Sequence, residues 1–336
     1  MKKGDKQAAG AFKRAARLAL QSVAHWQKPS GELWIVKNRF DSELRYGYDS
    51  YSFHSQYNLL TAAKLVNAFL HADDQIRELP CPAETGGFVF ALQPAFHKVF
   101  ANAGGMYLEI ETRADASYNP TGLLRVHHPQ VNPQLTVSDG ITLKPAYKTQ
   151  KLPTRALAIG PAWRDRNGDW HSLAEHDRKV LRDADVKVLG ENTDRVEFEV
   201  KYNGEFRGGA MSVRQKFTVT PKQIEVTDVI EGDVEAIRSY LPLFLSDGQN
   251  ETTIEVTGNQ ASATDKNGDA QTYKVLGANV KLERLGISEP FRNGALDAAY
   301  AETRGKSITY LIQPRSAARS NNRLKSKIIA AKLKKE

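Results

Sequence analysis

The sequence predicts an α+β protein in which a short N-terminal helical segment precedes a large antiparallel β-sandwich. Apolar residues recur at helical spacing in two segments before residue 79, whereas from about residue 86 they alternate with polar residues. The 336 residues, 40% of them hydrophobic, exceed one small domain and suit a folded protein with a sizeable core. No run of about 18 apolar residues occurs, so no transmembrane helix is expected.

Two helices are expected before residue 79. In residues 8–26 the apolar side chains return every three or four positions, and Pro29, Ser30 and Gly31 then end the helix. Residues 55–71 form the second helix, whose broad apolar face predicts that it is largely buried. Paired prolines follow in residues 80–85, which we interpret as a linker at the end of a helical segment 1–79.

The β-sandwich domain is expected over residues 86–314. Residues 196–202 alternate apolar and polar side chains, and turn signals such as Asn203-Gly204 separate this run from similar ones. Residues 165–169 (DRNGD) resemble an acidic calcium loop but lack its full ligand pattern, so we interpret them as a hairpin turn. Ten or more strands are too many for a small barrel, and a two-layer sandwich is therefore predicted.

The net charge of +8 lies at the two ends of the chain. Residues 315–336, the basic tail, carry +7 and residues 1–20 carry +5, so the body between them is acidic. A nucleic-acid-binding domain places its basic residues on the folded face that reads the nucleic acid, so no specific nucleic-acid partner is expected. The basic tail is expected to be solvated and to make weak contacts with polyanions.

A single cysteine, Cys81, excludes an intramolecular disulfide and a cysteine-rich zinc site. The nucleotide-binding, zinc-peptidase and serine-hydrolase motifs are missing, and neither a metal nor a cofactor is predicted. The N-terminus lacks the continuous apolar region of a signal peptide. This predicts a cytoplasmic chain as it stands, or a periplasmic or extracellular one if an N-terminal portion is missing.

The densest polar and aromatic cluster is residues 46–58, which lead into the second helix. If that helix begins near Ser52, then His54, Tyr57 and Asn58 share one of its faces. A histidine, a phenol and an amide on one face can serve as base, acid and carboxylate-binding group. The alternative is that these residues only cap and pack the start of the helix.

A second cluster opens the β region. His97 lies in an expected strand, where a core histidine is as plausible as a catalytic one. Tyr118 and Asn119 precede Pro120 and therefore lie in a turn, where Asn119 can be only a turn residue. Arg113 is the arginine of this region that we consider together with them.

The order of these parts resembles the C-terminal portion of the heparinase II/III-like polysaccharide lyases, in which an α/α toroid precedes a β-sandwich. The likeness covers about residues 8–313, and the stretches that carry it are residues 26–34, 53–60 and 96–98. It implies that the helices are the end of a toroid. It also implies β-elimination on a uronic-acid-containing polysaccharide, so that an acidic polysaccharide is the expected partner.

The resemblance also assigns roles to residues. Tyr57, or Tyr51, would be the base or acid, His54 a base or charge stabiliser, and His97 would approach from the sandwich. The residues expected to bind the substrate, including its carboxylate, are Asn58, Gln56, Arg45, Arg113, Tyr118 and Asn119. Arg45 or Arg113 beside a tyrosine would also lower the pKa of its phenol.

Two alternatives to a lyase remain at this stage. A non-catalytic module could bind glycans or dock a partner, with the helices as a structural collar. A glycoside hydrolase needs two carboxyl groups that flank the bond, whereas Asp49 is the only acid in the first cluster. Because only two or three helices fit before residue 80, the chain is expected to be either the C-terminal part of a longer enzyme or a remnant without a complete cleft.

Overall fold

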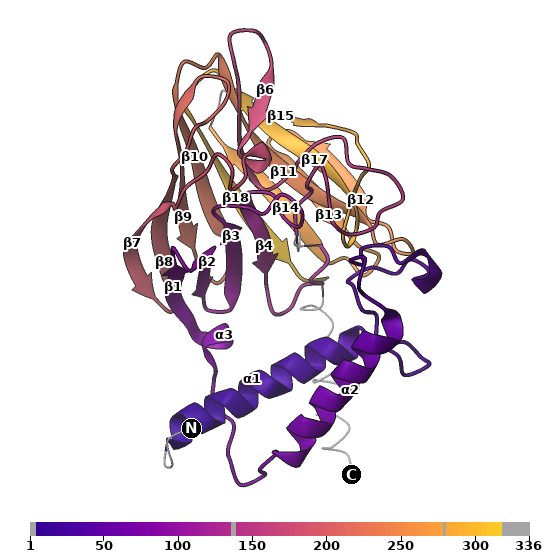
Figure 1. Cartoon of the computed structure of the whole chain (residues 1–336). Coiled ribbons are helices and arrows are strands. Elements are labelled where there is room, and N and C mark those ends of the chain that lie inside the picture. The colour runs from indigo at the N-terminus through magenta and orange to yellow at the C-terminus, as the bar shows by residue number, and fades with distance from the viewer. Residues whose placement is uncertain (1–4, 136–138, 278–279, 318–336) are drawn as a thin grey trace, which may run out of the picture.

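The computed structural model describes residues 5–135, 139–277 and 280–317, so residues 318–336 of the basic tail lie outside the described residues. Within these ranges three α-helices precede eighteen strands. The helices are α1 (Lys6–His25), α2 (His54–Leu70) and α3 (Pro82–Thr85), with short 3₁₀ turns η1 (Ser42–Leu44) and η2 (Leu173–Glu175). This arrangement, shown in Figure 1, confirms the predicted fold class of helices followed by antiparallel sheets.

The strands form three antiparallel sheets. The first has the order β1-β2-β3-β4, and the second has eight strands in the order β12-β13-β14-β18-β10-β9-β8-β7. The third has the order β15-β17-β11-β5-β6, with β16 also paired to β17. The bounds are β1 (Gly86–Leu92), β2 (Phe96–Ala103), β3 (Met106–Glu111), β4 (Gly122–His127), β5 (Gly160–Arg164), β6 (Trp170–Ser172), β7 (Asp185–Asn192), β8 (Arg195–Tyr202), β9 (Ala210–Val219), β10 (Ile224–Gly232), β11 (Ala236–Ser246), β12 (Thr253–Thr257), β13 (Gln260–Thr264), β14 (Ala270–Leu276), β15 (Lys281–Arg284), β16 (Glu289–Phe291), β17 (Gly294–Thr303) and β18 (Ser307–Arg315).

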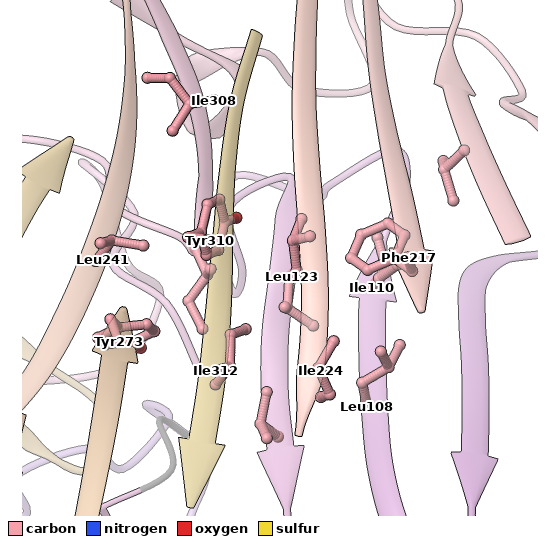
Figure 2. Close-up of a cluster of buried hydrophobic side chains, with 14 of the residues drawn as sticks. Leu108, Ile110, Leu123, Phe217, Ile224, Leu241, Tyr273, Ile308, Tyr310 and Ile312 are labelled. Carbon is pink, nitrogen blue, oxygen red and sulfur yellow. The ribbon is translucent and has the colours of Figure 1, made fainter. Parts of the chain in front are cut away.

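The eight-stranded sheet forms one layer, and the other two sheets pack against it. Strands β1 and β2 contact β7 and β8, while β5 and β11 contact β10 and β18. Figure 2 shows the apolar core between the layers, to which Leu108 of β3, Leu123 of β4, Phe217 of β9 and Tyr310 of β18 all belong. The alternation in β8 places Val196, Phe198 and Val200 in this core, because successive side chains of a strand point to opposite faces.

The DRNGD segment is a hairpin turn, as predicted. It joins β5 to β6, and Gly168 donates its N–H to the carbonyl of Asp165 at 3.1 Å. Asp165 also accepts the backbone N–H of Asn167 and Asp169 through Oδ1, at 2.9 and 3.0 Å. The side chain of Asp165 is therefore used to hold the turn.

Helix α1 is fixed to the sandwich through the segment that was expected to be a linker. Residues 82–85 form α3, and Glu84 accepts three bonds from the guanidinium of Arg14 on α1, the shortest at 2.6 Å. Arg17 forms an ion pair with Glu78 at 2.7 Å. In Figure 1 the helices α1 and α2 lie together below the strands, joined to β1 through α3.

The prediction that the second helix is largely buried is wrong. None of the residues of α2 is buried, and Leu59 and Phe69 are 71% and 80% exposed. The helix formed because its residues favour helix and its local pattern is apolar, but no described element covers that face. A groove of about 520 Å³ separates α2 from α1, lined by Leu20, Leu59 and Leu65 among others.

Candidate active site

Arg45 folds the segment that leads into α2. Its Nη2 atom donates to the carbonyls of Asp49, Ser50 and Ser52, at 3.2, 3.1 and 2.5 Å. The guanidinium also lies over the ring of Phe53, 4.7 Å from its centroid. One guanidinium can gather several carbonyls because all its N–H groups are donors. The charge expected to bind a substrate carboxylate is thus largely committed to the backbone.

The same segment is fixed to the sandwich. Arg292 forms an ion pair with Asp49 at 2.9 Å, and Gly47 donates its N–H to the carbonyl of Lys148 at 2.6 Å. Gly47 has a φ of 79°, and a Cβ at this position would lie 2.3 Å from the carbonyl oxygen of Arg292. Only glycine fits this close approach, so the segment from residue 45 to residue 58, here the α2-start segment, has one position relative to the sheets.

His54 is the first residue of α2 and lies between two polar groups. Its Nδ1 is 3.0 Å from the hydroxyl of Tyr48, and its Nε2 is 3.6 Å from a carboxylate oxygen of Glu32. Burial raises the pKa of the Tyr48 phenol, although the charge of Arg45 opposes the rise. Tyr48 is therefore protonated at neutral pH. Glu32, which was not among the site residues predicted from the sequence, is thus the third member of a row formed by Tyr48, His54 and Glu32.

Tyr51, Tyr57 and Tyr118 form a cluster of phenols. A hydrogen bond with Tyr57, and then the Asp49 carboxylate, raise the pKa of Tyr51, and the Tyr118 phenol contributes in the same direction. Tyr51 is 61% exposed and Tyr118 is 41% exposed, so both rings can reach a ligand. The prediction that a nearby arginine lowers the pKa of a tyrosine fails for Tyr51 and Tyr48, because hydrogen bonding and burial dominate instead.

The two amides expected to bind a carboxylate differ in their surroundings. Asn58 accepts the N–H of Leu33 at 2.7 Å and donates to the carbonyl of His54 at 3.0 Å. Its amide therefore joins α2 to the chain after α1. Gln56 lies on an exposed part of α2.

His97 is not brought together with the α2-start segment. It shares the face of β2 that carries the buried Val99, which points to the eight-stranded sheet. Its ring nitrogens lie 3.2 Å from Asp183 and 3.4 Å from Arg113. Arg113 thus belongs to this second cluster. Asn119 lies in the turn between β3 and β4, where its N–H bonds the carbonyl of Asp115 at 3.2 Å.

The opposite face of β2, β3 and β4 carries an ionic network that the sequence analysis missed. Lys98 pairs with Glu109, and lies 3.8 Å from Glu111. Arg125 binds Glu109 at 3.2 Å and Asp139 at 2.8 Å. Glu109 and Glu111 alternate with apolar residues in β3, and in a sequence this pattern indicates the solvated face of a strand. The signal that could have revealed them is their cross-strand pairing with Lys98 and Arg125.

Burial shifts the titration of this network. It raises the pKa of Glu111 to about 7, although the charge of Lys98 opposes the rise. It lowers the pKa of His127 to about 4, with the charges of Lys37 and Arg125 acting in the same direction. Lys37 also has a lowered pKa because of burial. A charge held away from water without full pairing is typical of functional sites.

Lys37 connects the ionic network to the tyrosines. Lys37 and Tyr57 line one cavity of about 280 Å³ next to the end of α1, together with Trp26 and Trp34. The ammonium group of Lys37 makes no hydrogen bond or ion pair with any residue of the described ranges, although its charge acts on Arg125 and His127. We call this cavity, which Lys37 and Tyr57 line, the cleft.

Among the described residues no group of three or more histidine, cysteine, aspartate or glutamate side chains could hold a metal ion. None of their helices is long and apolar enough to cross a membrane.

The comparisons with known proteins found similar folds among polysaccharide lyases. No family model matches the sequence, and no curated protein matches it. Heparan sulfate lyase HepC from Pedobacter heparinus superposes with a TM-score of 0.46 at 12% identity, over 89% of this chain and 46% of that one. Chondroitin AC lyase from Streptomyces coelicolor, in complex with chondroitin sulphate, gives 0.38 at 12% identity, over 90% and 42%. The chain thus spans less than half the length of these enzymes.

Proposed function

We propose that the cleft binds an acidic polysaccharide and cleaves it by β-elimination beside a uronic acid residue. The observations that carry the proposal are the effect of Tyr57 on Tyr51, whose pKa it raises, and the cavity that Tyr57 lines together with Lys37. Two phenols can exchange roles as proton donor and acceptor, and a cation beside them can neutralise the carboxylate of a uronate.

The reaction requires three things of the protein. A base removes the proton from the carbon next to the carboxylate, and an electron pair then forms a carbon–carbon double bond as the adjacent glycosidic C–O bond breaks. The leaving oxygen takes a proton from an acid. Tyr51, whose raised pKa keeps it protonated at neutral pH, is the acid, and Tyr57 removes the proton as a phenolate and becomes a neutral phenol. Lys37 neutralises the carboxylate, and this stabilises the charge that develops on it.

His54 positions this pair without taking part in the transfer. Its Nδ1 is committed to Tyr48, and Nε2 lies near Glu32, so the imidazole is held from both sides at the start of α2. Because Tyr57 follows one turn later on the same helix, fixing His54 fixes the helix face from which Tyr57 points.

The experiment follows the absorbance of the unsaturated uronate product in the ultraviolet. Heparan sulfate and chondroitin sulfate, the polysaccharides named for the similar enzymes, are the first substrates. Tyr57→Phe and Tyr51→Phe are each expected to lower kcat by at least 100-fold, because each removes a proton-transfer group. Tyr300→Phe, on β17, is the matched control and is expected to keep full activity. Equal activity in all variants would overturn the assignment.

A second candidate function is glycan binding without cleavage. It is favoured by the commitment of Arg45 and Asn58 to backbone groups, because both were expected to hold the carboxylate. In that case the absorbance stays flat while affinity electrophoresis shows retention by heparan sulfate. Lys37→Met would weaken the retention whether or not the polysaccharide is cleaved, so the absorbance is the measurement that distinguishes cleavage from binding alone.

A further inference from the structure

A second cavity, of about 400 Å³, lies where the end of α1 meets the turns at one end of the sandwich. We call it the sandwich-end pocket. His25 and Arg39 line it from the helical part, and the turns between β11 and β12 and between β13 and β14 line it from the sandwich. It shares no lining residue with the cavity that holds Lys37 and Tyr57. Its size is within the range of small-molecule sites.

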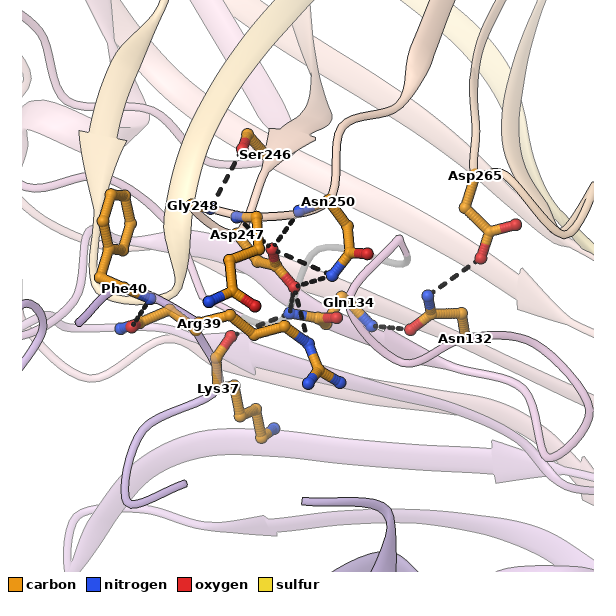
Figure 3. A network of polar contacts seen from close by, with 12 residues as sticks. Lys37, Arg39, Phe40, Asn132, Gln134, Ser246, Asp247, Gly248, Asn250 and Asp265 are labelled. Atoms are coloured by element: carbon orange, nitrogen blue, oxygen red, sulfur yellow. Dashed lines mark hydrogen bonds and ion pairs between the residues drawn. The ribbon is translucent and has the colours of Figure 1, made fainter. Parts of the chain in front are cut away.

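Asp247 fixes the polar groups of this pocket in place. The residue is fully buried, and its carboxylate lies 3.2 Å from the Nε atom of Arg39. The same carboxylate accepts bonds from the side-chain amides of Gln134 at 3.3 Å and Asn250 at 3.0 Å. Figure 3 shows these side chains converging on Asp247 from separate segments of the chain. Donors held in this way need little reordering when a ligand binds.

Part of this polar surface has no partner in the protein. The two Nη atoms of Arg39 make no hydrogen bond or ion pair within the described ranges, and Figure 3 shows them pointing away from Asp247. The guanidinium lies 6.0 Å from the ring centroids of both Trp26 and Trp34, so two aromatic rings support its position. Burial, followed by the charge of Arg39, lowers the pKa of His25, which leaves a neutral ring beside the guanidinium.

The composition of the lining identifies a class of ligand. Two cations, Arg39 and Lys266, are balanced by two carboxylates, Glu251 and Asp265, and five amide side chains lie between them. A hydroxyl group both donates and accepts, so it finds partners among all of these groups, whereas a sulfate or phosphate would meet two carboxylates. Phe244 adds an apolar surface that can contact the C–H face of a ring.

We propose that the sandwich-end pocket binds an uncharged, hydroxyl-rich ring, that is, a neutral sugar residue. This goes beyond the proposed function, which concerns an acidic polysaccharide in the cleft, and it does not depend on it. A carbohydrate site here would hold a glycan at a second place on the same molecule.

The test is saturation-transfer NMR on the full chain with glucose, galactose and N-acetylglucosamine. Glucuronate and inorganic sulfate are the anionic probes. At least one neutral sugar is expected to receive saturation, and neither anion is expected to displace it. The proposal is overturned if no neutral sugar receives saturation, or if glucuronate or sulfate displaces the sugar.

The chain offers a matched pair of variants. Residues 165–169 and 265–269 form the same turn, in which Asn167 and Asn267 donate to the first aspartate at 2.9 and 2.8 Å. Only Asn267 lines the pocket, and both side chains are exposed. Asn267→Tyr is expected to weaken sugar binding at least tenfold by filling the pocket, and Asn167→Tyr is expected to leave it unchanged. Equal binding by the two variants would also overturn the proposal.

Discussion

Glu111 and Lys37 are both charged side chains held away from water, but of the two only Glu111 lies within ion-pair distance of an opposite charge among the described residues. Glu111 is 7% exposed and lies 3.8 Å from Lys98, which already pairs with Glu109. One cation shared between two carboxylates compensates each of them incompletely. The pKa of Glu111 therefore rises to about 7, and the folded protein holds a proton that the unfolded chain has released.

This difference predicts how stability changes with pH. Between the ordinary pKa of 4.5 and about 7, the folded state binds more protons at Glu111 than the unfolded state, so the contribution of Glu111 to the free energy of unfolding decreases as pH rises. Glu111→Gln removes this loss and is expected to stabilise the protein by about 2 kcal/mol at pH 8, but not at pH 4. Urea unfolding at both pH values measures it. Glu225→Gln, on the outer face of β10, is the control, and an equal gain at both pH values would contradict the prediction.

Alanine substitutions at Gly31 and Gly47 distinguish the cost of backbone strain from the cost of losing the contact that docks the α2-start segment. Both have positive φ, 79° and 91°, but a Cβ at Gly31 would meet nothing within 4 Å whereas at Gly47 it would meet the carbonyl of Arg292. Gly31→Ala is expected to cost about 1 kcal/mol in unfolding free energy. Gly47→Ala is expected to cost more, and also to speed hydrogen exchange across residues 45–58. Similar exchange in the two variants would show that this contact does not fix the segment.

At the scale of elements, local sequence patterns predicted which helices and strands exist better than they predicted how these elements pack. The helices were expected over residues 8–26 and 55–71 and lie at Lys6–His25 and His54–Leu70, because helical spacing and end signals are local properties of the chain. The first strand, β1, begins at Gly86, where the period of the sequence changes to two. The prediction that α2 is largely buried was wrong because burial depends on which other element lies opposite the helix, and no local pattern contains that information.

The candidate site shows the same limit. Tyr51 and Tyr57 could be found because they belong to one local cluster of residues. Lys37 could not, because it approaches Tyr57 only through the packing of the chain that follows α1. The face of β2 that carries His97 could not be predicted either, because an offset of one residue in a strand moves a side chain to the opposite face.

The exposed face of α2 leads to a prediction about stability. Leu59 and Phe69 make no contribution to the sandwich core, so Leu59→Ser with Phe69→Ser is expected to change the unfolding free energy by less than about 0.5 kcal/mol. Leu108→Ala, fully buried in β3, is expected to cost about 2–5 kcal/mol. Thermal unfolding of both variants measures the two changes in stability. A large loss in the α2 variant would show that this face is covered in solution.

For the molecule as a whole, the two layers of sheet act as a frame on which separate segments meet. The cleft combines the end of α1, the chain that follows it and Tyr57 of α2, and Arg292 of the sandwich pairs with Asp49 of the α2-start segment. The sandwich-end pocket likewise combines Arg39 with the turns between β11 and β12 and between β13 and β14. Because the large core between the layers fixes these segments, substitutions in either site are expected to change binding more than folding.

The uneven charge of the chain predicts how salt affects binding. Removing residues 318–336 lowers the net charge from +8 to +2, while the described cleft with Lys37 remains. Exposed charges are screened beyond about 10 Å at 0.1 M salt, whereas buried charges are screened much less. The affinity of the full chain for heparan sulfate is therefore expected to fall at least tenfold between 50 and 300 mM NaCl, and that of the truncated chain about threefold. Titration calorimetry at both salt concentrations measures the two slopes. Parallel slopes would mean that the basic tail does not contact the polysaccharide, and that the cleft alone accounts for its electrostatic attraction.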